Sequence, residues 1–178
     1  MPNIKPCVNA HNRKVMSEET QPATTRTCNC PRNATCPMDG NCLSQNTLYA
    51  GTITSNLPNY GEKKYAGVSA PPWKSRLGNH ALSFNKRKYE KNSAIAKEVW
   101  RIKDKGGEFS IAWRIIGHAV AYNPTSKRCN LCLSEKLYIA ENTGTNLLNQ
   151  RNELISKCRH MNKYSLMYHN SRKEMPPD

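Results

Sequence analysis

The stretch that decides the fold is TLYAGTIT (residues 47–54), followed after a polar turn by KYAGVS (64–69) and then by PPWKSRLGNH (71–80). β-Branched and aromatic residues make up most of the first segment, which predicts a strand, and the second segment is predicted to be another short strand. Two prolines open the third segment, as proline commonly does at the first turn of a helix. The sequence therefore predicts a pair of strands followed directly by a helix.

Four polar side chains in this stretch form a candidate phosphate site. Tyr49 and Tyr65 lie on the two predicted strands. Arg76 and His80 are four residues apart, so they share one face of the predicted helix. Together these side chains can converge on a phosphate, although Tyr is also common in strands and Arg on solvated helix faces.

The overall charge favours a polyanionic partner. The 178-residue chain has 27 Lys and Arg against 13 acidic residues, a formal net charge of +14. This balance favours nucleic acid over an anionic membrane. The chain contains no apolar run of ~18 residues, so no membrane-spanning segment is predicted. Because the N-terminus also lacks the apolar core of a signal peptide, we expect an intracellular protein.

Eight cysteines in a reducing compartment indicate metal binding more than disulfides. The sequon NAT at 33–35 would suit a secreted disulfide protein, which is the weaker alternative. Cys28, Cys30, Cys36 and Cys42 lie close together in a polar loop and can surround one tetrahedral Zn²⁺. Metal binding would then supply the folding free energy of this loop. Binding by only some of these thiols is the other possibility.

A second set of metal ligands joins distant segments. Cys129 and Cys132 can combine with Cys158 and His160 in a zinc site of three cysteines and one histidine. An equally tetrahedral alternative replaces the first two ligands by Cys36 and Cys42. The sequence does not choose between these partitions, and it predicts one or two structural zinc ions.

Three further elements follow the first helix. A helix capped by Asn92 or Ser93 carries core residues at helical spacing and ends at the glycine pair 106–107. A third strand alternates apolar residues from Phe109 to Ile115, with His118 in a loop beyond it. The last helix lies within 127–139, with an expected buried face at Leu133, Leu137 and Tyr138. Its Glu135 would ordinarily be a surface carboxylate.

Basic residues cluster between the first two helices, from Phe84 to Lys91. A solvated loop is the plain interpretation, but the position after the Arg76/His80 helix favours contacts with a phosphate backbone. The residues predicted to contact DNA are Lys74, Lys86, Arg87, Lys88 and Lys91.

The ordered set of motifs resembles the GIY-YIG nuclease family, in particular the endonuclease domain of Penelope-like retrotransposons. Leu48-Tyr49 stands where that family has Ile-Tyr, and Tyr65-Ala66-Gly67 stands for Tyr-Ile-Gly. The segments CPMDGNC (36–42), RCNLCLSEK (128–136) and LNQRNELISKCRH (148–160) extend the resemblance over roughly residues 28–168.

This resemblance implies an α+β fold with a small mixed or antiparallel three-stranded sheet flanked by helices and zinc-stapled extensions. It divides the chain into four parts. A lead-in (1–27) resembles the tail of a reverse transcriptase region, and a zinc-binding segment (28–46) follows it. The nuclease domain (47–168) and a polar tail (169–178) complete the chain.

The resemblance also implies a reaction, the nicking of duplex DNA in the nucleus with Mg²⁺ or Mn²⁺. Tyr49 would act as general base or orient the water, and Arg76 would hold the scissile phosphate. Because a free Tyr has a pKa near ~10, Arg76 and the cation would have to lower the pKa of Tyr49. His80 would assist phosphate binding or position Tyr49. The implied site residues are Tyr49, Tyr65, Arg76, His80, Glu135 as the Mg²⁺ or Mn²⁺ ligand, and Asn149 as a supporting residue.

Two alternatives remain open at this point. One is a catalytically inactive, zinc-stabilised nucleic-acid-binding module derived from a retroelement. The other is an interaction domain with structural zinc ions, which leaves the Arg76/His80 face and the basic segment unexplained.

Overall fold

A computed structural model of the chain describes residues 27–31, 36–123, 126, 128–142, 144, 146–149, 154, 157–158 and 160. The predicted tail (169–178), the sequon (33–35) and all of the predicted lead-in except Thr27 lie outside these residues. The domain boundaries therefore stay predictions.

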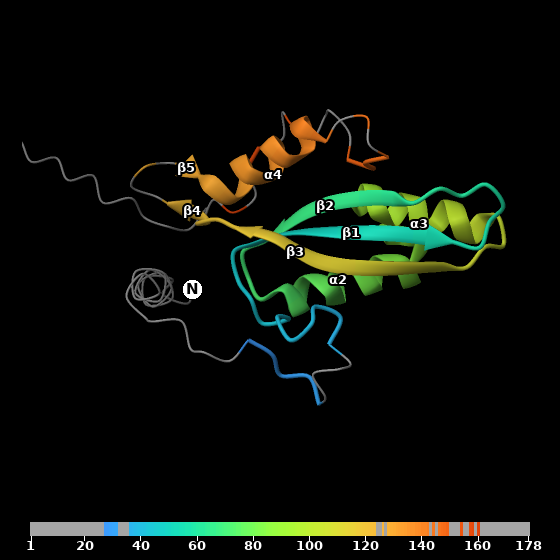
Figure 1. Cartoon of the computed structure of the whole chain (residues 1–178), viewed down its shortest axis with the longest axis horizontal. Helices are drawn as coiled ribbons and strands as arrows, with labels where there is room; N and C mark the ends of the chain where they lie inside the picture. Colours follow the sequence, from blue (N-terminus) through green and yellow to red (C-terminus); the bar gives the residue numbers. More distant parts are fainter. Residues whose placement is uncertain are drawn as a thin grey trace, which may run out of the picture.

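A three-stranded antiparallel sheet forms the centre of the fold (Figure 1). β1 (Thr47–Ser55) lies in the middle, with β2 (Lys63–Ser69) on one side and β3 (Phe109–His118) on the other. The predicted α+β class, the three strands and their antiparallel arrangement are confirmed. His118 does not lie in a loop as predicted, because it pairs with Thr47 and ends β3.

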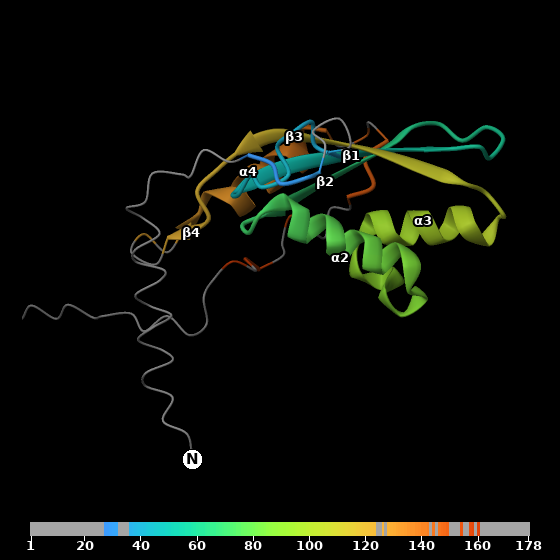
Figure 2. The same ribbon diagram turned by 90° about the horizontal axis from the view of Figure 1, so that it is seen from below.

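Two helices cover one face of the sheet (Figure 2). α2 (Trp73–Asn85) begins directly after Pro72, and α3 (Ala94–Asp104) begins after Ser93, whose hydroxyl accepts a hydrogen bond from the Ala96 N–H. Both helices were predicted. The basic segment between them is not simply a loop, since it forms the 3₁₀ helix η2 (Arg87–Asn92).

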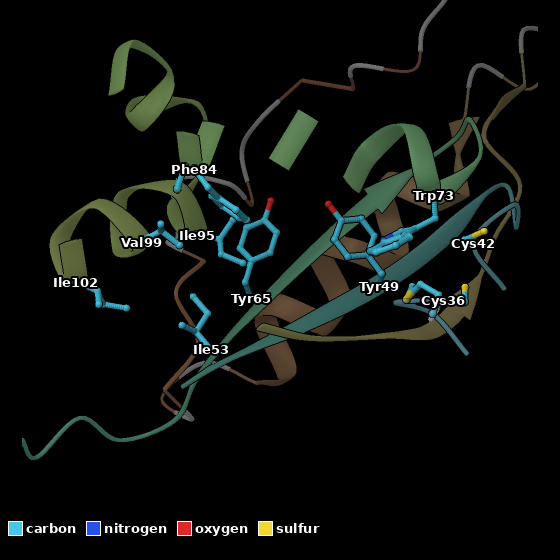
Figure 3. Packing of buried hydrophobic residues seen from close by; sticks show 12 residues of the cluster. Cys36, Cys42, Tyr49, Ile53, Tyr65, Trp73, Phe84, Ile95, Val99 and Ile102 are labelled. Atoms are coloured by element: carbon cyan, nitrogen blue, oxygen red, sulfur yellow. The ribbon is translucent and has the colours of Figure 1, made fainter. Parts of the chain in front are cut away.

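The hydrophobic core lies between the sheet and these helices. Figure 3 shows Ile53 of β1 pointing toward Ile95, Val99 and Ile102 of α3, and all four side chains are fully buried. The predicted core spacing of α3 is confirmed. This packing fixes the two helices against the face of β1 from which Tyr49 projects.

α4 (Asn130–Glu141) follows a short hairpin of β4 (Tyr122–Asn123) and β5 (Arg128–Cys129). It packs against β2 and β1, beside β2 in Figure 1. The prediction that Leu133 and Leu137 lie on the buried face of α4 is wrong, since these residues are 56% and 60% exposed. The buried apolar residues are instead Leu131 and Ile139. Glu135 lies four residues from each of these two and so shares the inward face.

Candidate functional site

Tyr49 is the centre of the candidate site. It is fully buried on β1, and its hydroxyl lies 2.7 Å from Nε2 of His80. The same hydroxyl oxygen accepts a hydrogen bond of 3.0 Å from Nε of Arg76. Both partners come from α2, where their four-residue spacing presents them on one face toward β1. The predicted grouping of these three residues is thus present.

The rings around Tyr49 fix this arrangement. The imidazole of His80 stacks on Trp113 of β3, with ring centroids 5.1 Å apart. Tyr65 of β2 lies beside Tyr49, with ring centroids 6.4 Å apart. Sequence reasoning treated Trp113 only as an apolar strand residue, and the pattern of β3 held no signal that its ring supports His80.

The position of Gly67 explains why the Tyr-Ala-Gly motif ends in glycine. It pairs with Tyr49 across the β1/β2 ladder. A Cβ at Gly67 would lie 2.6 Å from the Tyr49 hydroxyl oxygen and 2.7 Å from the ring carbon Cζ. The ring of Tyr49 therefore extends over this position because no side chain occupies it.

The protonation states follow from burial. Burial, and then the nearby charge of Arg76, lower the pKa of His80 to about 3. The imidazole is therefore neutral near pH 7, and Nε2 can accept the Tyr49 hydroxyl proton. Assigning the proton in this way makes Tyr49 a donor to His80 and an acceptor from Arg76.

The protein's own groups do not lower the pKa of Tyr49, and the lowering expected from Arg76 together with a bound cation stays a prediction. Burial raises the pKa of Tyr49, and although Arg76 acts in the lowering direction, it does not outweigh burial. The charge of Glu135 raises this pKa as well, which places that carboxylate close enough to influence Tyr49. Tyr49 is consequently a protonated phenol in the resting protein.

Arg76 is a half-buried cation. Burial lowers its pKa, but Tyr49 and Tyr65 outweigh this effect and raise the pKa, so the guanidinium stays charged. Within the part of the chain that the structure describes, it forms no ion pair with a carboxylate. The partners described for its guanidinium are the hydroxyl groups of Tyr49 and Tyr65, which do not cancel its charge, and this suits a site for an anion.

A pocket of about 250 Å³ brings three predicted residues together. Tyr65 from β2, Arg76 from α2 and Glu135 from α4 all line it. Lys136 and Lys157 line it as well, and sequence reasoning missed both. The pocket is thus formed where α4 meets the end of β2 and the start of α2.

Asn149 does not line this pocket. Its side chain binds the backbone of Ala66 instead, accepting from the N–H at 2.8 Å and donating to the C=O at 3.0 Å. Leu148 also donates its N–H to the carbonyl of Lys64, so this segment follows the outer edge of β2. Asn149 therefore holds the strand that carries Tyr65 and Gly67.

The first cysteine cluster has the geometry of a zinc site. The Sγ atoms of Cys28, Cys30, Cys36 and Cys42 all lie within 4.8 Å of one another. Sγ of Cys42 lies 3.6 Å from that of Cys28 and 3.7 Å from that of Cys30. A tetrahedron with Zn–S bonds of ~2.3 Å has S–S edges of about 3.8 Å, so the sulfurs fit this ion.

Backbone N–H groups favour the thiolate form of Cys36. Burial raises its pKa, but hydrogen bonds from the N–H groups of Met38 and Gly40 outweigh this and lower the pKa to about 7. The turn that aims these groups needs positive φ at Asp39 (47°) and Gly40 (85°). A thiolate, the form that binds zinc, is thus favoured at this position.

The second cluster contains Cys129, Cys132, Cys158 and His160, whose ligand atoms also lie within 4.8 Å of one another. Sγ of Cys132 is 3.5 Å from Sγ of Cys158 and 3.2 Å from Nδ1 of His160. The first of the two predicted partitions is therefore the one assembled. The alternative with Cys36 and Cys42 is not brought together. Both clusters are plausible zinc sites.

The basic residues predicted to contact DNA lie outside the pocket. Lys74 donates to the Asn29 side chain at 2.7 Å, and Arg87 forms a two-point ion pair with Asp104 at 2.6 and 2.8 Å. Lys88 lies over the ring of Tyr89. Lys86 and Lys91 are exposed. Their contacts with DNA stay predictions, and Arg87 is the member whose charge is already paired.

The helices of the described chain are all too short or too polar to span a lipid bilayer. Comparison of the chain with protein-family models, with curated proteins and with solved structures finds no match.

Proposed function

We propose that this chain is a divalent-metal-dependent DNA endonuclease of the GIY-YIG type and of retroelement origin. One observation carries the proposal. A single pocket is lined by residues from three different elements, Tyr65, Arg76 and Glu135. Arg76 also donates a hydrogen bond to the hydroxyl oxygen of the buried Tyr49. The substrate would be duplex DNA, cut in the nucleus, and a reverse transcriptase region would be a partner in the parent element.

Arg76 would bind the scissile phosphate. Its fork of N–H donors matches phosphate oxygens, and its described partners are phenols that do not cancel its charge. Negative charge grows on these oxygens during phosphodiester hydrolysis. A preorganised guanidinium would therefore stabilise the transition state more than the bound substrate.

Tyr49 would orient the attacking water, and His80 would position Tyr49. The neutral imidazole lies 2.7 Å from the phenol oxygen and accepts the hydrogen of its hydroxyl group, which leaves the phenol oxygen as an acceptor for the water. This role needs no resting phenolate, which agrees with the raised pKa of Tyr49. His80 would then position and assist Tyr49 in place of binding phosphate itself.

Glu135 would hold Mg²⁺ or Mn²⁺. It lines the pocket from the inward face of α4, and a hard cation of this kind keeps several waters and so needs few protein carboxylates. When bound, the cation supplies charge neutralisation at the phosphate and a water of lowered pKa.

A plasmid-nicking assay tests the proposal. Wild-type protein is expected to nick supercoiled DNA only with Mg²⁺ or Mn²⁺ present, and Glu135→Ala should abolish nicking while circular dichroism and zinc content stay unchanged. Glu141→Ala is the matched control, because Glu141 is an exposed carboxylate on the same helix. Full activity of Glu135→Ala would refute the assignment of this residue. DNA binding without any cleavage by wild type would instead favour the inactive binding module.

A further inference from the structure

Two lysines line the pocket beside Glu135. Lys136 follows Glu135 on α4 and is half-buried, whereas Lys157 is exposed and comes from the segment that leads to Cys158. They are about twenty residues apart in the chain, and both line this one pocket. Neither belongs to the basic segment around η2 (Arg87–Asn92).

The charge of the pocket favours more than one anionic group. Its lining contains three cationic side chains, Arg76, Lys136 and Lys157, against one carboxylate, Glu135. Three minus one leaves a formal charge of +2. Cys132 and His160 of the second cysteine cluster also line the pocket, so a zinc ion held there with its three thiolates would contribute −1, and the proposed Mg²⁺ or Mn²⁺ at Glu135 would contribute +2. A single phosphodiester carries one negative charge, so one scissile phosphate at Arg76 does not balance this surface.

The second cysteine cluster fixes both lysines in place. Cys132 lies one helical turn before Lys136, and Cys158 directly follows Lys157. The sulfurs of these two cysteines are 3.5 Å apart, which ties α4 to the later segment. The lysine backbones therefore have defined positions next to the pocket, although their side chains are long.

We propose that Lys136 and Lys157 bind the phosphates that neighbour the scissile one, so that a DNA strand runs across Glu135 along α4. This inference rests on the proposed function. DNA presents one phosphate per ~3.4 Å of helix axis on each strand, so a strand with one phosphate at Arg76 brings the next ones to the rim of the same pocket. The lysines would position the strand, and Arg76 alone would contact the reacting group.

A competing role for the lysines is to balance the metal centre. Zn²⁺ with three thiolates and one imidazole carries a formal charge of −1, and both lysines lie close in sequence to a cysteine ligand. In that case their loss would weaken zinc retention and folding but leave DNA binding unchanged. The two roles therefore predict different measurements.

The test is fluorescence anisotropy of a labelled random-sequence duplex in a titration of salt, without added Mg²⁺ or Mn²⁺. Lys136→Gln and Lys157→Gln should each reduce the slope of log K against log salt by roughly 0.9, and the double variant by about twice that amount. Lys105→Gln is the control, because Lys105 is exposed at the end of α3 and does not line the pocket. Its slope should equal that of wild type.

Unchanged slopes in both lysine variants would overturn the proposal. Unchanged slopes together with lost zinc would assign the lysines to the metal centre. Lys→Arg at either position should keep the slope, since the charge is retained. Failure of the proposed function appears elsewhere, as plasmid that stays uncut with Mg²⁺ and Mn²⁺, so the two outcomes are distinguishable.

Discussion

Two hydrogen-bond networks, each containing a tyrosine and an arginine, lie near opposite ends of β1. They differ in whether a carboxylate pairs with the arginine. At one end Tyr60 donates to Glu98 at 2.8 Å, and the same carboxylate pairs with Arg101 at 2.6 Å and with Lys63 at 3.1 Å. At the other end Tyr49 bonds to Arg76 and His80, and no described carboxylate pairs with the arginine.

The difference separates a structural network from a candidate site. Glu98 is buried but has two cationic partners, so its desolvation is compensated and it joins the β1–β2 loop to α3. Arg76 is half-buried and lines a pocket, and none of the carboxylates in the described part of the chain forms an ion pair with it. Such a cation contributes little to folding stability, because partly buried charges are usually paired within the protein. A charge that lacks a partner of opposite sign is expected where a ligand supplies it.

The largest expected effect comes from replacing Arg76 by alanine. Arg101→Ala, from the other network, is measured in the same assay for comparison. Arg76→Ala should lower the single-turnover cleavage rate on saturating DNA by about 10²-fold or more, as loss of one preorganised donor does. Arg101→Ala should leave this rate unchanged and lower the urea midpoint of unfolding. Equal cleavage rates for wild type and Arg76→Ala would show that Arg76 only positions DNA.

Removing the carboxylate tests the structural network. Glu98→Gln should cost roughly 2–3 kcal/mol in the free energy of unfolding, because Lys63 and Arg101 lose their partner but are partly exposed. Urea unfolding measures this change, with the DNA cleavage rate as the control that should stay at the wild-type value. A loss of cleavage at full stability would mean that this end of the sheet also takes part in function.

A pair of glycine substitutions perturbs the candidate site without changing any charge. Gly67→Ala places a Cβ against the buried Tyr49 ring and should destabilise the fold by roughly 1–3 kcal/mol, with slower cleavage. Gly78→Ala is its control, because Gly78 is exposed in α2 with no atom near the new Cβ, and it should stabilise by somewhat less than ~1 kcal/mol. Thermal denaturation distinguishes them, and equal shifts would show that the Tyr49 ring moves freely.

The smallest effect concerns pH. His80 has a pKa of about 3 when folded against about 6.5 when unfolded. Between these values the unfolded chain binds the extra proton, so stability rises with pH and falls on acidification below pH 6.5. The slope is at most about 1.4 kcal/mol per pH unit. Urea unfolding from pH 6.5 to 5 should show a steeper loss for wild type than for His80→Asn, whereas parallel curves would contradict a neutral buried imidazole.

Local patterns explain why much of this fold could be predicted. Alternating apolar residues set β3, the Ser93 cap set the start of α3, and the spacing of Arg76 and His80 placed both toward Tyr49. Each of these depends on neighbours within one turn or one strand pair. The four ligands of the first cysteine cluster are equally local.

What could not be predicted depends on distant contacts. Leu133 and Leu137 look like a buried helix face, but the sheet meets α4 through Leu131 and Ile139. Lys157 lines the pocket next to Cys158, whose sulfur contacts that of Cys132, and the sequence left that pairing open. The supporting role of Trp113 likewise requires knowing which strand residue faces His80.

The segment at 146–149 also covers an edge of the sheet. β2 is an edge strand, and an uncovered edge offers unpaired N–H and C=O groups on which a second molecule can add a strand. Asn146 and Leu148 pair with Lys64, and the Asn149 amide satisfies both backbone groups of Ala66. A chain ending just after α4 would lose this cover. Such a truncated protein is then open to aggregation through β2, which makes the residues after α4 protectors of solubility as well as parts of the site.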